Sequence, residues 1–175
     1  TALAADVMPG VGTSNHAVEL ADGRLLISIY GGGAEGDGGE ILGVLASRDR
    51  GATWGDFVEL HREPEFQGME CELAELDDGR LVALIRRTHK ELGLRAVSYD
   101  GGETWSETEE VPVGHAPGIL VDGGMMLVNH RARADGTPAR GYDDMGTVVS
   151  LSLDGGRSFV AHLPLGVFEE RITHG

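Results

Sequence analysis

Apolar residues recur along this chain in short runs, and a glycine-containing turn separates each run from the next. The pairs Asp22-Gly23, Asp78-Gly79 and Asp122-Gly123 each stand between two apolar stretches, a pattern typical of a β-hairpin. The flanking stretches predict strands at residues 16–20, 25–30, 72–76, 81–85, 118–121 and 125–129. No stretch shows a convincing helical period. The pattern therefore predicts an all-β protein.

An octapeptide of the form Ser-x-Asp-x-Gly-x-x-Trp/Phe follows each hairpin, at residues 47–54, 98–105 and 152–159. Its aspartates at positions 49, 100 and 154 are 51 and 54 residues apart. An aspartate carboxylate accepts hydrogen bonds from the backbone of a turn, and glycine supplies a positive φ angle. The aromatic ring suits burial between sheets. We therefore interpret the octapeptide as a structural turn between two strands.

Together the hairpins and the octapeptides define a repeat of four antiparallel strands in about 50 residues. The repeats extend over about residues 12–62, 66–112 and 114–165 of a single unit that comprises residues 1–175. Such units are typical of β-propeller blades, and propellers close with four to eight blades. Three blades predict about half of a ring, either as a piece of a longer chain or as a chain that associates with itself. The tail from Val167 to Gly175 completes no repeat, which favours a piece.

Composition narrows the classes of function. The chain has 29 acidic and 14 basic residues, a net charge of −15, so we expect no nucleic-acid partner, because phosphate binding needs a basic surface. No apolar run is long enough to span a membrane. Cys71 is the single cysteine and the seven histidines show no metal-binding spacing, so no disulfide, metal or cofactor is expected. The compartment stays open between cytoplasmic and exported.

The topology of a four-stranded blade predicts which face carries function. Loops between strands two and three, and links between repeats, share the face opposite the Asp-Gly turns, and variable loops on a regular scaffold commonly carry function. Arginines gather on this loop face, at Arg86, Arg87, Arg131, Arg133 and Arg140. Acidic residues join them at Glu35, Asp37, Glu65 and Glu70. The pattern indicates a cationic cluster within an acidic protein.

The octapeptide is the Asp-box, or BNR repeat, and the chain resembles the sialidase (neuraminidase) superfamily over about residues 12–160. The resemblance implies a propeller of six blades when complete, of which about three are present here. It also implies a retaining glycoside hydrolase, of the exo-α-sialidase kind, that removes a terminal sialic acid or related sugar from glycans. Members of the superfamily bind the sugar carboxylate with three arginines. They use an aspartate as acid/base and a tyrosine nucleophile that a glutamate deprotonates.

The resemblance assigns candidate residues on the loop face. Asp37 stands where the acid/base aspartate is found, and Glu70 matches the glutamate. Arg86 or Arg87 matches the second arginine; since successive residues of a strand point to opposite sides, only one can face the site, and we favour Arg86. Arg140 resembles the third arginine.

Two features of the superfamily are missing. The Arg-Ile-Pro motif that carries the first arginine is replaced by Ser14-Asn15-His16, where His16 is the candidate substrate contact. None of Tyr30, Tyr99 and Tyr142 matches the nucleophile. The resemblance favours an enzyme. The departures keep an alternative open, a non-catalytic propeller that binds glycans or proteins.

Overall fold

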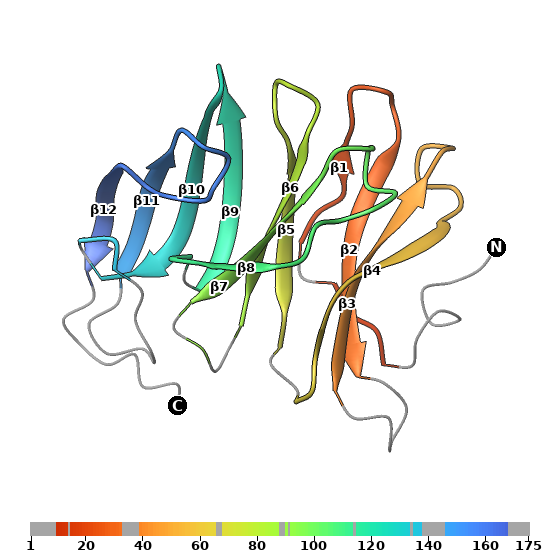
Figure 1. Ribbon diagram of the computed structural model, residues 1–175, viewed down its shortest axis with the longest axis horizontal. Helices are drawn as coiled ribbons and strands as arrows, with labels where there is room; N and C mark the ends of the chain where they lie inside the picture. The colour runs from red at the N-terminus through yellow and green to blue at the C-terminus, as the bar shows by residue number, and fades with distance from the viewer. Residues whose placement is uncertain are drawn as a thin grey trace.

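The computed structural model describes residues 10–13, 15–32, 39–65, 68–87, 90, 92–113, 115–133, 135–137 and 146–167. These residues form three four-stranded sheets and no helix (Figure 1). Consistent with this, nothing in the described part of the chain qualifies as a helix long and apolar enough to cross a membrane. The predicted all-β class is confirmed.

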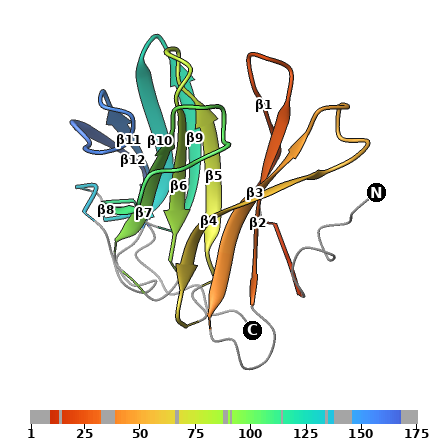
Figure 2. The ribbon, with the colours of Figure 1, turned by 45° about the vertical axis from the view of Figure 1, so that its right-hand side comes forward.

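Each sheet is one blade, in which the strands follow one another in chain order and pair antiparallel. The first blade contains β1 (Val18–Glu19), β2 (Leu25–Gly32), β3 (Glu40–Ser47) and β4 (Gly55–Glu63). The second contains β5 (Glu70–Glu75), β6 (Leu81–Arg86), β7 (Gly93–Ser98) and β8 (Glu109–Val111). The third contains β9 (His115–Asp122), β10 (Met125–Ala132), β11 (Gly146–Ser152) and β12 (Ala161–Val167). Figure 2 shows the blades side by side, as in a propeller.

A common register relates the three blades. The serine that opens each Asp-box pairs with a residue near the start of strand two, in the pairs Ser47–Leu25, Ser98–Leu81 and Ser152–Met126. The first two hairpins have loops of residues 20–24 and 76–80. In the third, Gly123 and Gly124 form a two-residue turn with positive φ angles, and Asp122 pairs with Met125. Because the third turn differs, an alignment of the repeats on their Asp-Gly pairs places the third blade one residue out of register with the other two.

The Asp-boxes form hydrogen-bonded turns, as their composition indicates. The Asp100 carboxylate accepts the Thr104 backbone N–H at 2.9 Å and its hydroxyl at 2.5 Å. The Ser98 hydroxyl donates to Asp100 and accepts the Gly102 N–H, both at 2.8 Å. The hydrogen bonds to the Asp100 carboxylate lower its pKa to about 2, and the bond from the Thr104 hydroxyl has the largest effect. The turns at residues 47–54 and 152–159 repeat the arrangement.

The hydrophobic core lies between the blades, where the facing apolar sides of neighbouring blades pack together. One cluster fills the space between the first and second blades and includes Leu26, Leu42, Leu81 and Ile85. A second cluster joins the second and third blades and includes Val82, Leu84, Met126 and Val128. Trp105 packs on the first cluster and Phe159 on the second. Each of these Asp-box aromatics therefore lies toward the preceding blade.

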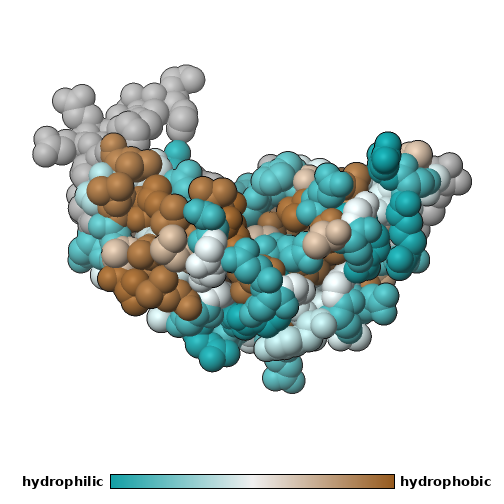
Figure 3. All heavy atoms as spheres, turned by 90° about the horizontal axis from the view of Figure 1, so that it is seen from above, coloured by the Kyte–Doolittle hydropathy of each residue, from teal (hydrophilic) through white to brown (hydrophobic). Residues whose placement is uncertain are grey.

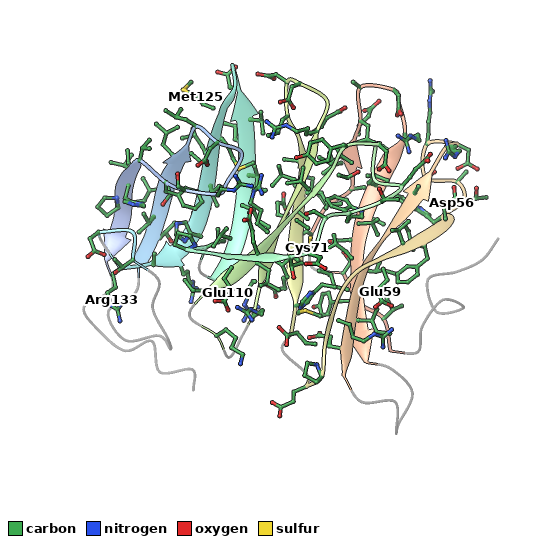
Figure 4. All side chains as sticks on the ribbon, in the orientation of Figure 1. Asp56, Glu59, Cys71, Glu110, Met125 and Arg133 are labelled. Atoms are coloured by element: carbon green, nitrogen blue, oxygen red, sulfur yellow. The ribbon has the colours of Figure 1, made fainter. Side chains whose placement is uncertain are left out.

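Cys71 belongs to the first of these clusters, and Figure 4 shows it among packed side chains in the middle of the molecule. Burial raises the pKa of its thiol far above the ordinary value. Cys71 therefore acts as a small apolar residue rather than as a nucleophile.

Candidate functional site

The candidate site lies on the loop face, which is the lower side of the molecule in Figure 1. There β2 ends at Gly32, β3 begins at Glu40, β5 begins at Glu70 and β6 ends at Arg86. The Asp-Gly turns and the Asp-boxes lie at the opposite ends of these strands. The site therefore rests on the ends of rigid strands, which hold side chains in more defined positions than loops do.

Glu70 and Arg86 form the centre of the candidate site. They pair directly across β5 and β6, and Arg86 Nη1 lies 2.8 Å from Glu70 Oε2. Arg86 is buried, and its Nε has no hydrogen-bond partner within the described part of the chain. The guanidinium has further donors besides the one that faces Glu70, and such donors can bind a second carboxylate. The pair can thus offer a proton acceptor and an anion-binding group side by side.

Arg87 faces the other side of the second blade, as the alternation of a strand dictates. Its guanidinium lies 3.3 Å from Glu63 and 2.7 Å from Glu110, and it donates to the Leu92 carbonyl at 3.0 Å. Figure 4 shows Glu110 near the lower end of β8. Glu63 ends the first blade and Glu110 belongs to the second, so Arg87 joins two blades. Of the two candidate arginines, the structure therefore brings only Arg86 to Glu70.

Glu72 is a second carboxylate on the same side of β5 as Glu70. It is buried, and burial raises its pKa, while the charge of His16 acts in the opposite direction. His16 Nδ1 lies 3.5 Å from Glu72 Oε1, and the histidine side chain is otherwise exposed. His16 thus reaches from the first blade to the second. His16 was a candidate from the sequence and Glu72 was not, although the period of two in a strand beginning at Glu70 could have pointed to Glu72.

Glu40 holds the start of β5 in place. It is fully buried, and its two carboxylate oxygens lie 3.2 and 3.1 Å from the Met69 backbone nitrogen, which donates to them. Met69 immediately precedes Glu70, so this contact fixes the entry of the site strand from the first blade. Glu40 therefore positions Glu70.

Arg131 occupies in the third blade the position that Arg86 occupies in the second. The register places Arg131 opposite His115 just as it places Arg86 opposite Glu70. From the sequence, Arg131 was expected only as one of the arginines of the loop face. The equivalence of Arg131 and Arg86 is not evident in the sequence. The two-residue turn at Gly123 and Gly124 shifts the third blade by one residue when the repeats are aligned on their Asp-Gly pairs.

The other two candidates, Asp37 and Arg140, lie outside the described residues. Among the side chains that the structure places, no three of histidine, cysteine, aspartate and glutamate are arranged to hold a metal ion.

Comparison with known proteins identifies the family. The model of the BNR repeat-like domain matches residues 6–166. The chain belongs to this family. Among curated proteins, the anhydrosialidase of Macrobdella decora is 32% identical over 134 residues, which is 76% of this chain and 16% of that protein. The predicted resemblance of the chain to the sialidase superfamily is thereby confirmed.

Several solved structures share the fold of this chain. A protein of unknown function from Dyadobacter fermentans matches with a TM-score of 0.72 at 19% identity, over 89% of this chain and 42% of that one. The Hadza microbial sialidase Hz136 matches with a TM-score of 0.63 at 19% identity, over 87% of this chain and 30% of that one. The NanB sialidase of Streptococcus pneumoniae matches with a TM-score of 0.62 at 22% identity, over 87% of this chain and 23% of that one. The chain spans less than half of each of these proteins, and it provides about three propeller blades.

Proposed function

We propose that this chain carries part of the active centre of a sialidase-like glycoside hydrolase that removes a terminal sialic acid or related acidic sugar from glycans. The observation that carries the proposal is the Glu70–Arg86 pair, in contact at 2.8 Å on the loop face. The family membership and the relatives named as sialidases support it.

Arg86 would bind the carboxylate of the sugar. A guanidinium is planar and permanently charged, and its donors match the two oxygens of a carboxylate. Glu70 already occupies one edge of Arg86, so a substrate carboxylate would share the remaining donors. The net charge of −15 opposes an anionic substrate only weakly, since at physiological salt fields are screened beyond about 8 Å. The local guanidinium therefore decides the sign of the interaction.

Glu70 would accept the proton of the nucleophile. A carboxylate can take up the proton of a neighbouring hydroxyl, and a weak nucleophile such as a phenol requires a neighbouring base. His16 and Glu72 would contact neutral polar groups of the sugar beside the carboxylate site. Asp37 as acid/base and Arg140 as a further carboxylate ligand complete the proposal.

Hydrolysis of an aryl sialoside tests the enzymatic part of the proposal, and titration with N-acetylneuraminic acid tests the binding part. Glu70→Gln should lower turnover by about 10²- to 10⁴-fold, the usual contribution of a general base, and leave sugar binding largely intact. The matched control is Glu59→Gln, which changes an exposed carboxylate paired with Arg62 on β4. Turnover of the Glu70→Gln variant equal to that of the control would overturn the proposed role.

The alternative is a non-catalytic propeller that binds acidic glycans at the same arginine. The placement of two tyrosines favours it: Tyr30 packs against the core between the first two blades, and Tyr99 lies exposed on an Asp-box. Binding of N-acetylneuraminic acid without turnover, unchanged in Glu70→Gln and lost in Arg86→Met, would support this function.

A further inference from the structure

A groove lies between the first two blades, beside their edge strands β4 and β8. These strands lie on the convex side of the arc of blades, and Figure 3 shows mainly hydrophilic side chains over the middle of that side. The groove has a volume of about 520 Å³, which is within the range of small-molecule sites. Its lining comes from β4 and from the segment that leads into β8: Glu59, Leu60, His61, Arg62, Glu107 and Thr108.

A hydroxyl, an imidazole and a carboxylate follow one another beside this groove. Thr108 Oγ1 lies 3.0 Å from His61 Nδ1, and His61 Nε2 lies 3.4 Å from Glu63 Oε1. Thr108 is half-buried, whereas the side chains of His61 and Glu63 are only 20% and 14% exposed. A carboxylate beside Nε2 favours the tautomer with its hydrogen on that atom, which leaves the lone pair of Nδ1 facing the Thr108 hydroxyl.

The contact between His61 and Glu63 is loose, since Nε2 forms no hydrogen bond in the described part of the chain. Catalytic hydrogen bonds are commonly long before substrate binds and tighten in the complex. The carboxylate itself is held in place by Arg87, whose Nη1 lies 3.3 Å from the same Glu63 oxygen and whose Nη2 lies 2.7 Å from Glu110. All of these residues belong to the first two blades, so the array needs no further blade to complete it.

We propose that Thr108, His61 and Glu63 form a second catalytic site, which hydrolyses esters of short carboxylic acids with polar alcohols. A hydroxyl within reach of an imidazole that a carboxylate orients is the arrangement by which hydrolases form a covalent acyl intermediate. The substrate class follows from the groove, because five of its six lining residues are polar or charged. Such a lining suits a polar alcohol and leaves little apolar surface for a long acyl chain.

The reaction has two steps, which together consume one ester and one water and release one acid and one alcohol. In the first step, Thr108 Oγ1 attacks the ester carbonyl and His61 Nδ1 takes up the hydroxyl proton. The bond between the carbonyl carbon and the alcohol oxygen then breaks, and His61 gives the proton to the leaving alcohol. In the second step, water attacks the acyl-threonine, and its proton passes through His61 to Thr108 Oγ1. Arg62, the arginine of the groove lining, supplies positive charge for the oxyanion.

Hydrolysis of p-nitrophenyl acetate by the whole chain tests the proposal. His61→Gln should lower the rate by about 10²- to 10⁴-fold, the usual contribution of a general base. Thr108→Val should lower it to the same level, because groups that act as a unit lose most of their effect when either is removed. Thr108→Ser, which restores a hydroxyl, should recover most of the rate. The matched control is Thr147→Val, which changes a threonine on β11 in the third blade and should leave the rate unchanged.

Peptide mapping by mass spectrometry provides a second measurement that does not depend on how any variant folds. The wild-type protein should carry an acetyl group on Thr108 after a short exposure to the ester. Acetylation of another residue and not of Thr108 would overturn the proposal, as would equal rates in wild type and Thr108→Val. A rate that falls in His61→Gln but not in Thr108→Val would also refute it, because His61 would then act without the hydroxyl.

Discussion

Replacing Arg86 by methionine is the sharpest test of the carboxylate-binding site. Methionine keeps the apolar stem of the arginine side chain and removes the guanidinium. A hydrogen bond to a charged group is worth about 1.5–3 kcal/mol. Since each tenfold change in affinity corresponds to about 1.36 kcal/mol, loss of one such contact should weaken binding of N-acetylneuraminic acid by about 13- to 160-fold.

Arg87 provides the matched control, because it is the next residue in the chain and equally buried, but its guanidinium is held by Glu63 and Glu110. Arg87→Met should lower the melting temperature, since it leaves two carboxylates without their partner, and should leave the affinity of the folded protein unchanged. Isothermal titration measures the affinity, and circular dichroism confirms folding. Equal affinity in wild type and Arg86→Met, or an equal loss in both variants, would refute our reasoning about which arginine faces the site.

Three further predictions concern stability. Gly102→Ala should lower the free energy of unfolding in urea by about 1–3 kcal/mol, because the new Cβ would lie 2.9 Å from Leu26. Gly79→Ala, also at positive φ but with open space around it, should lower it by less. Equal losses in the two variants would contradict the packing argument. Burial raises the pKa of Glu72, so wild-type stability should fall as pH rises through that pKa, and Glu72→Gln should remove part of this slope; an unchanged slope would count against a buried Glu72. Burial lowers the pKa of His130 to about 4, so stability should be lost as pH falls from about 6.5 toward 4, and an NMR titration of His130 near 6.5 would disprove this.

The blades and the Asp-boxes could be predicted from the sequence because their signals are local. The hydrogen bonds of an Asp-box join residues at most four apart, as Asp100 and Thr104 show. A hairpin needs only a turn and two alternating stretches. The strand bounds shifted by a few residues, as in β1, which spans Val18–Glu19 where the pattern predicts residues 16–20. These shifts left the order of the elements unchanged.

The candidate site was less predictable, because its contacts cross from blade to blade. Glu40 and Met69 are 29 residues apart, and Arg87 and Glu63 are 24 apart. No local pattern in the sequence predicts that Glu72 lies next to His16. The equivalence of Arg131 with Arg86 depends on the length of one turn, which only the register of the sheet reveals.

The sequence by itself determined the repeat, the four-stranded blade and the face that carries the loops, since turn chemistry and the alternation of strands act over a few residues. Only the tertiary structure decided that Arg86 meets Glu70 while Arg87 joins two blades, and that Leu127 is exposed while its counterparts Leu26 and Val82 are buried. The physical reason is that a residue's partner and its burial are set by the neighbouring blade, which packs through side chains far away in the chain.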